Sequence, residues 1–299
     1  MSRFIFAALA SFLPAAIAAA QHVPGRDLLE FPLGLMAEAP PLSSQMTGGL
    51  WNPANIAIRS PIRAEIGFAG LTTPQEQGVR LEMLAGSYKV RPNLTASLSY
   101  AQASVSNIIG TDTDPTSNGG GSEIPYSTML VSAGAALTRG TLTLGAALRY
   151  RYGTVISDHG SAIGIDGGAI VDRVAGTPLR LAVSTFLLTP SRSAGEATYL
   201  AAADVPVFHR DSSFVVRGGY SISHTEGRGR EDYAFASSAY RQLDVSGGVS
   251  QMNLFGNVSR RMRLGFGLRY AGYTVAVGRE DGAAGISASY QFLVKRTFR

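Results

Sequence analysis

The chain contains no cysteine, so disulfides, thiolate metal sites, catalytic thiols and a lipidated N-terminal cysteine are all excluded. Charged residues are also scarce, at 16% of the sequence against about a quarter in a typical soluble domain. After the N-terminal twenty or so residues no apolar run is as long as the ~18 residues that a membrane-spanning helix needs. Glycine, in contrast, is abundant, with 35 residues. This combination favours an outer-membrane β-barrel, with a secreted soluble β-protein as the alternative.

The N-terminus has the composition of a cleavable secretory signal over residues 1–20. It has a basic start, a mostly apolar run over residues 4–17 and an alanine triplet before Gln21. Pro14 and the small-residue tail argue against the alternative, a membrane anchor. We therefore expect a signal peptide at 1–20, an N-terminal hatch or plug segment at 21–62 and an outer-membrane barrel at 63–299.

Residues 141–152 alternate between two kinds of side chain. Because successive side chains of a β-strand point to opposite faces, this segment would have two different faces. One face is apolar and ends in tyrosines: Leu142, Leu144, Ala146, Leu148, Tyr150 and Tyr152. The other is small or charged: Thr141, Thr143, Gly145, Ala147, Arg149 and Arg151. The pattern is typical of a strand with lipid on one side and a polar lumen on the other.

The same alternation recurs along the chain and predicts fourteen strands. They are expected at residues 63–73, 78–90, 94–106, 126–138, 141–153, 161–172, 178–188, 196–206, 213–223, 232–240, 243–252, 260–270, 273–280 and 284–294. One boundary is ambiguous, because the apolar phase shifts by one residue at Ala271-Gly272. Either a β-bulge in one long strand or a two-residue hairpin between two strands would produce this shift.

Link lengths favour the hairpin. Links after even-numbered strands are short, and most links after odd-numbered strands are longer or more polar: 74–77, 107–125, 154–160, 189–195, 224–231 and 253–259. Outer-membrane barrels have an even strand count, short periplasmic turns and longer outer loops. The sequence therefore predicts an all-β transmembrane antiparallel barrel of fourteen strands, with twelve as the alternative.

Residues 21–62 do not alternate, and they contain the only tryptophan of the chain, in the tetrad Trp51-Asn52-Pro53-Ala54. Asn52 suits a helix N-cap and Pro53 the first helical position, so the tetrad read by itself is a capped helix or turn. Placed before a fourteen-strand pattern, it resembles the FadL-type outer-membrane transport superfamily. That superfamily includes the long-chain fatty-acid transporters and the PorV/PorQ-type proteins of the type IX secretion system. The stretches 163–170, 179–183 and 287–292 also resemble strands of its barrels.

The resemblance implies that residues 21–62 enter the barrel from the periplasm as a hatch, with Trp51, Asn52, Pro53 and Ala54 in it. It implies passive uptake of small hydrophobic or amphipathic molecules, with outer-membrane lipid and a hydrophobic ligand as partners. The alternative is a PorV-like barrel that docks or shuttles secreted proteins of a secretion system. The link 107–124 is polar, unlike the apolar helical hairpin that captures fatty acids, and this favours the alternative.

Several charged residues fall on the presumed inward faces of the strands and are candidates to line the lumen: Arg149, Arg151, Asp166, Arg180, Asp204, Arg217, Asp244, Arg263 and Arg269. They could form a structural ladder, since a charge in a dry interior must be paired or hydrated. They could instead form a positive constriction that favours an anion or a carboxylate head group. Ile170, Phe186 and Leu188 share the inward phase and would add apolar surface.

Catalysis is not expected. Asp158, His159 and Ser161, with His224 in another link, could place a base beside a hydroxyl, but Asp, Ser and Gly are ordinary loop residues. The four histidines lack metal-ligand spacing. The arginines are dispersed rather than gathered in a patch, which argues against nucleic acid despite a pI near 9.6. No catalytic residue, metal, cofactor or nucleic-acid partner is predicted.

Overall fold

A computed structural model describes residues 23–106, 108, 124–189, 197–210, 214–254, 257–282 and 288–299. The expected signal peptide lies outside the described residues, and so does most of the link 107–124. In the described part of the chain, no helix has both the length and the apolar character needed to cross a membrane.

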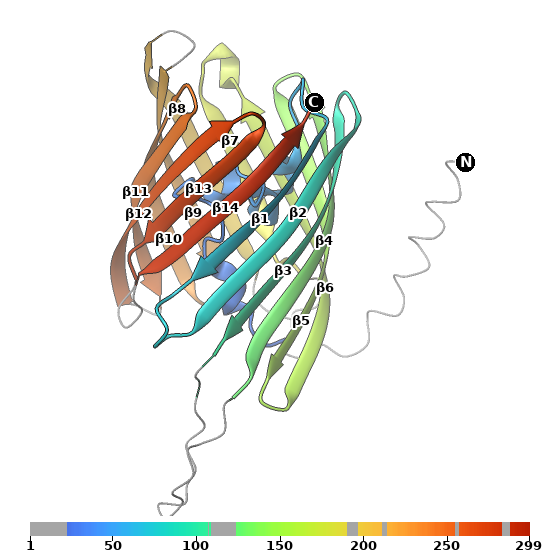
Figure 1. Cartoon of the computed structure of the whole chain (residues 1–299), viewed down its shortest axis with the longest axis vertical. Helices are drawn as coiled ribbons and strands as arrows, with labels where there is room; N and C mark the ends of the chain where they lie inside the picture. Colours follow the sequence, from blue (N-terminus) through green and yellow to red (C-terminus); the bar gives the residue numbers. More distant parts are fainter. Residues whose placement is uncertain are drawn as a thin grey trace, which may run out of the picture.

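The chain forms one closed antiparallel barrel of fourteen strands, each paired with its neighbours in sequence, and β1 closes on β14 (Figure 1). The strands are β1 Ala64–Thr72, β2 Val79–Arg91, β3 Leu94–Val105, β4 Tyr126–Arg139, β5 Leu142–Val155, β6 Asp158–Asp172, β7 Arg180–Phe186, β8 Thr198–Arg210, β9 Phe214–Thr225, β10 Gly229–Tyr240, β11 Leu243–Leu254, β12 Asn257–Tyr270, β13 Tyr273–Glu280 and β14 Ser289–Phe298. Closure satisfies the backbone groups that hydrocarbon cannot bind. The predicted fold class and strand number are confirmed.

The alternation seen in the sequence separates the outer surface from the interior. In β5, Leu144 and Leu148 are 49% and 45% exposed, whereas Thr143 and Ala147 on the other face are 8% and 4% exposed. The same contrast recurs on the other strands, so a continuous apolar belt surrounds the barrel. Such a belt is the surface that lipid covers in a membrane barrel.

The hairpin at Ala271-Gly272 is confirmed. Tyr270 pairs with Tyr273, and the two residues between them have φ values of 49° and 84°. Both values belong to the left-handed region, as a tight type I′ hairpin requires. We call the end of the barrel with this hairpin, where β1 starts and β14 ends, the turn end (upper end in Figure 1), and the opposite end the loop end.

Three links at the loop end are shorter than predicted. The expected loop 154–160 is wrong, because β6 starts at Asp158 after a turn at Ile156 and Ser157. The expected loops 224–231 and 253–259 are wrong in the same way, since β10 starts at Gly229 and β11 runs to Leu254. At the turn end, β8 and β14 also run past their predicted ends, to Arg210 and Phe298. Polar residues at a barrel rim face headgroups and water while their backbone continues the ladder, so polarity alone does not end a strand.

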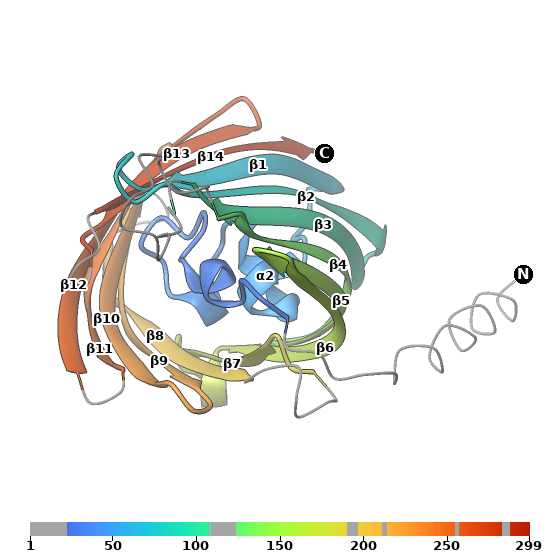
Figure 2. The ribbon, with the colours of Figure 1, turned by 90° about the horizontal axis from the view of Figure 1, so that it is seen from below.

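Residues 23–62, which we call the inner segment, lie inside the barrel (Figure 2). They contain the short helices η2 Asp27–Glu30, η3 Pro40–Leu42, α2 Gly48–Trp51 and η4 Pro53–Ile56, and a further short helix, η5 Val174–Gly176, lies between β6 and β7. The predicted capping is confirmed: Asn52 caps η4, and Pro53 is at its start. The segment begins beside Thr128 and Gly153 at the loop end, and Arg59 pairs with Asp172 at the turn end.

Candidate functional site: the inner segment in the lumen

Asn52 has a side chain with 0% exposure and connects the motif to the rest of the inner segment. Its side-chain amide donates a hydrogen bond to the carbonyl oxygen of Pro41, and its carbonyl accepts one from the N–H of Ala54, both at 2.9 Å. An asparagine can do this because its short amide carries both a donor and an acceptor. The bonds fix the start of η4 against η3.

The wall of the barrel is shaped to this motif by two glycines. Gly145 of β5 and Gly168 of β6 lie opposite each other in the β5–β6 register. A Cβ at Gly168 would fall well within 3.0 Å of Oδ1 of Asn52, and one at Gly145 would collide in the same way with the backbone of Pro53 and Ala54. The absence of side chains at these two positions therefore lets the motif approach the strands.

Side chains of β5 and β7 bind Trp51, the first residue of the motif, and Leu50 before it. Trp51 stacks on Phe186 with ring centroids 4.8 Å apart. Ser184 donates from Oγ to the carbonyl oxygen of Trp51 at 2.9 Å, and Arg149 donates from Nη2 to that of Leu50 at 2.5 Å. The motif and the residue before it are thus attached to β5 and β7 by hydrogen bonds and ring stacking.

Arg149 and Asp166 form a buried ion pair, with 2.5 Å between Nε and Oδ2 and with side chains 1% and 0% exposed. The Asp166 carboxylate also accepts the N–H groups of Leu187 and Leu188, at 3.0 and 2.9 Å. Since β6 pairs with β7 only from Gly168 onwards, the carboxylate binds backbone groups that the ladder leaves unpaired. The predicted inward position of Leu188 is wrong: it is 37% exposed, and Leu187, whose φ is 56°, is buried instead.

The opposite wall binds the inner segment at a second place. Met36 and Ala37 both have left-handed backbones, with φ values of 49° and 62°. The hydroxyl of Tyr233 donates to the carbonyl oxygen of Ala37 at 2.6 Å, and that of Ser246 donates to the carbonyl oxygen of Met36. A non-glycine residue in this conformation costs about 1 kcal/mol or more, so the contacts with the wall help to keep the turn in place.

The predicted lumen-lining charges lie inside the barrel, mostly in ion pairs. Arg180 and Arg217 both bind Asp204, which is almost fully buried, and Arg269 binds Asp244 at 2.9 Å. Arg151 is 4% exposed near the loop end. These pairs balance much of the positive charge, so the arrangement has the form of the structural ladder. A role for these residues in selecting an anion stays a prediction.

Arg263 has two acidic partners that the sequence pattern did not reveal. It pairs with Glu231 at 2.6 Å and with Glu280 at 3.2 Å, and its guanidinium carbon lies 4.8 Å from the ring centroid of Tyr233. The pattern places Glu231 in a loop, because it predicts a later start for β10. Glu280 alternates in step with the inward-facing Ala276 and Gly278 of β13, so its inward position could have been predicted from the sequence.

A third charged group holds the start of the inner segment at the loop end. Glu30 pairs with Arg26 and Arg228, each at 3.3 Å. Burial raises the pKa of the Glu30 carboxyl above its ordinary value, although Arg228 and Arg26 act to lower it. Docking of this end of the segment is therefore coupled to proton binding.

Along β1–β4, the part of the lumen nearer the loop end is apolar. Leu28, Leu29, Leu33 and Leu35 of the inner segment pack against an apolar inner wall: Ala69, Leu71, Leu81, Met83, Ala101, Ala103 and Leu130. Nearer the turn end, a cavity of about 260 Å³ adjoins the inner segment, with Met36, Leu42 and Phe235 beside Arg217 and Arg269. Its lining is thus partly apolar and partly charged.

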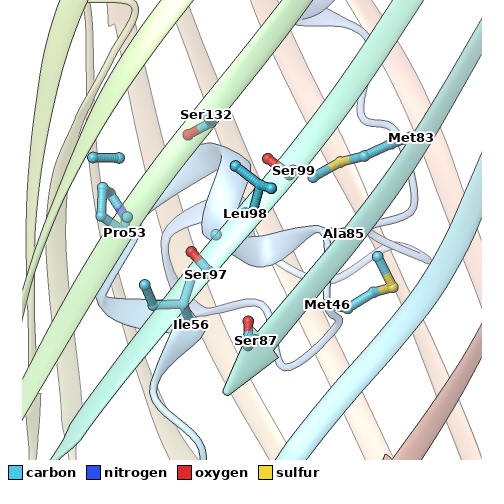
Figure 3. Close-up of a pocket in the computed structure, with 13 residues that line it drawn as sticks. Met46, Pro53, Ile56, Met83, Ala85, Ser87, Ser97, Leu98, Ser99 and Ser132 are labelled. Atoms are coloured by element: carbon cyan, nitrogen blue, oxygen red, sulfur yellow. The ribbon is translucent and has the colours of Figure 1, made fainter. Parts of the chain in front are cut away.

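The inner segment contacts β2–β4 differently from β5–β7. A cavity of only about 10 Å³ separates Met46, Pro53 and Ile56 from these strands, and serines dominate the facing wall (Figure 3): Ser87, Ser97, Ser99 and Ser132. That volume holds about one water molecule. On this side the segment therefore packs closely against small polar side chains.

The residues of the hydrolase alternative do not come together. Asp158, His159 and Ser161 lie on β6, whereas His224 lies on β9, and two strands separate these in the barrel. His159 and His224 are themselves paired along the ladder with Thr154 and Tyr199.

Comparison with protein-family models found no match, and comparison with curated proteins found none either. Among solved structures, the chain is similar to the Pseudomonas putida toluene transporter TodX, with a TM-score of 0.60, 10% identity, and 88% of this chain and 96% of that chain covered. It is also similar to a Pseudomonas aeruginosa FadL homologue, with a TM-score of 0.56, 11% identity and the same coverage. The fold is that of a FadL-type outer-membrane barrel.

Proposed function

We propose that this barrel takes up small hydrophobic or amphipathic molecules passively across the outer membrane, and that the inner segment acts as its hatch. The observation that carries the proposal is the apolar inner wall of β1–β4 near the loop end, covered by leucines of the inner segment. A water-filled pore has a polar interior, so this wall would be out of place in a general porin. Displacement of the leucines would leave an apolar surface for a solute.

The cavity near the turn end supports the amphipathic part of the proposal. At about 260 Å³ it approaches the volume of ordinary small-molecule sites, and it combines apolar side chains with Arg217 and Arg269. A solute that has passed the leucines would therefore meet a place for its polar group. TodX transports toluene, a small hydrophobic molecule of the class proposed for this barrel. The link that favours protein docking lies outside the described residues, so docking stays a prediction.

The proposal is tested by locking the inner segment to the wall. Asp27 of the inner segment and Tyr126 of β4 are joined by a side-chain hydrogen bond, and the chain has no cysteine, so a short bis-methanethiosulfonate linker can connect cysteines placed at these two positions. In proteoliposomes, the cross-linked Asp27→Cys/Tyr126→Cys variant should not admit a fluorescent fatty acid or toluene, and reductant should restore uptake. The two single variants, treated with the same linker, are the matched controls.

Two results would overturn the proposal. One is that liposomes with the unlocked protein take up the apolar probes no faster than liposomes without protein. The other is rapid swelling in arabinose, which would indicate a polar pore.

A further inference from the structure

The two ends of the barrel differ in how their exposed basic residues are partnered. At the loop end, Arg80, Arg230 and Arg279 each pair with an acid two residues further along the chain, and one exposed arginine, Arg260, forms no ion pair among the described residues. At the turn end, seven exposed arginines form no ion pair within the described part of the chain: Arg63, Arg91, Arg139, Arg173, Arg241, Arg296 and Arg299. The turn end therefore has a surplus of positive charge.

The described acids at the turn end do not balance this surplus. Glu65 pairs with Lys295 at 3.7 Å, Asp172 with Arg59 at 2.8 Å, and Asp244 with Arg269 at 2.9 Å. Each of these acids is thus already bound to another base. The acids in the described part of the chain therefore leave the exposed arginines without a carboxylate partner.

Arg296 is the arginine placed most clearly toward lipid. It is exposed and shares the outward face of β14 with Tyr290, Phe292 and Val294, which are 50%, 44% and 43% exposed. Its guanidinium carbon lies 5.0 Å from the ring centroid of Tyr273 and 4.9 Å from that of Phe298. Two aromatic rings thus hold the planar charged group on the outer surface.

The depth of Arg296 matches that of lipid phosphates. It lies two residues before the end of β14, among exposed aromatic residues that include Tyr270 and Tyr273, and such residues mark the membrane interface. The backbones of Arg63 and Arg299 lie at the same rim, since Arg63 donates its N–H to the carbonyl oxygen of Phe298. Their positions have the inward phase of Glu65 and Lys295, so Arg296 is the arginine of this seam that faces lipid. An arginine binds phosphate oxygens through two parallel N–H groups, which gives it an advantage at such a site.

We propose that the seam where β14 closes on β1, at the turn end, binds the phosphodiester of an anionic phospholipid through Arg296, which lies between the rings of Tyr273 and Phe298. The short turns make this the periplasmic end of the barrel. The lipid occupies the site from the membrane side, because the flanking side chains on β14 face lipid. An acidic protein in the periplasm could reach Arg63 and Arg299, but Arg296 with its rings belongs to the lipid-facing surface. The site is independent of the solute that the barrel transports.

The test uses the full chain, purified after insertion, in mixed micelles of phosphatidylglycerol and phosphatidylcholine. Native mass spectrometry counts the lipids that stay bound. Arg296→Gln should lower phosphatidylglycerol affinity about fivefold, the effect expected for one arginine at an anionic surface. Arg279→Gln is the matched control, because Arg279 lies on the paired strand β13 but at the other end of the barrel. Inorganic phosphate should not displace the lipid.

Equal phosphatidylglycerol binding by Arg296→Gln and Arg279→Gln would overturn the proposal, and so would equal binding of phosphatidylcholine by the unmodified chain. Heat-modifiable migration on gels shows whether each variant is folded. If Arg296→Gln does not insert, Arg296→Lys replaces it, since lysine keeps the charge but lacks the two parallel N–H groups that bind a phosphate. Unchanged binding in Arg296→Lys would then refute the site.

Discussion

Replacing Asn52 by alanine should release the inner segment without weakening the barrel. The change removes both hydrogen bonds of a side chain with 0% exposure, so the carbonyl oxygen of Pro41 and the N–H of Ala54 lose their partners in a buried place. Each orphaned group costs about 1–3 kcal/mol. The lower bound for the two is about 2 kcal/mol, which raises the open fraction roughly thirtyfold. Asn52 contributes nothing to the strand ladder, so barrel stability should stay the same.

The assay exploits the absence of native cysteine. Ser184→Cys is a nearly isosteric change at a wall position that the inner segment covers, with 7% exposure and a hydrogen bond to the carbonyl of Trp51. A water-soluble maleimide should label this cysteine only when the segment moves away. In that background, Asn52→Ala should accelerate labelling about thirtyfold.

Asn55→Ala is the matched control. Asn55 belongs to the same short helix, but it is only half-buried and its two hydrogen bonds are longer, at 3.3 Å. Its replacement should accelerate labelling much less. If Asn52→Ala and Asn55→Ala label alike, the buried amide does not hold the segment and the reasoning is refuted. Emission of Trp51, the only tryptophan, gives an independent view of the same movement.

Three further predictions concern the wall and the pH. Gly168→Ala should speed labelling of Ser184→Cys at least tenfold, since the new Cβ meets Asn52, whereas Gly167→Ala, with open space around it, should have no effect. Asp166→Ala should lower the free energy of unfolding of the barrel by about 3–5 kcal/mol, because it leaves Arg149 buried without its counterion. Urea titrations followed on gels measure this change. Asp244→Asn, in a half-exposed ion pair, should lower the free energy of unfolding by less than about 1 kcal/mol. The raised pKa of Glu30 means that the docked segment holds this proton more tightly than the undocked one, so docking should weaken as pH rises through that pKa. Hydrogen exchange of residues 26–31, corrected for intrinsic rates, should show this dependence, and Glu30→Gln should abolish it.

The wall of the barrel could be predicted from the sequence because lipid and lumen impose a period of two on every strand. Leu142 and Arg149 therefore revealed their faces without any knowledge of their neighbours. The hairpin at Ala271-Gly272 followed from strand parity. Rim positions such as Asp158 were misjudged, because polar residues there are compatible with both a loop and a ladder.

The site itself depends on contacts between segments far apart in the chain, and these have no local signal. Gly145 and Gly168 look like ordinary strand glycines in the sequence, and their fit to Asn52 arises only when β5 and β6 pair in register. Likewise, Tyr233 carries no mark of its bond to Ala37. The cap at Asn52 was predictable, since it acts two residues away; its bond to Pro41 was not.

The internal contacts of the inner segment predict that it moves as one body. The carboxylate of Glu38 binds the side chains of Ser44 and Gln45, both at 2.9 Å, and Asn52 joins this part to the motif through Pro41. The wall contact at Met36 and Ala37 should therefore open together with the contact at Trp51.

Tyr233→Phe tests this coupling, because it removes only the hydrogen bond to Ala37. A loss of about 1 kcal/mol should speed labelling of Ser184→Cys about fivefold, although Ser184 is on β7, three strands away from β10. Combined with Asn52→Ala, the two factors should multiply, since both changes destabilise the docked state relative to the same open state. Tyr240→Phe, on the same strand but facing lipid, should leave the rate unchanged. If Tyr233→Phe also has no effect, the segment opens in independent pieces, and each wall then releases its own part of the hatch.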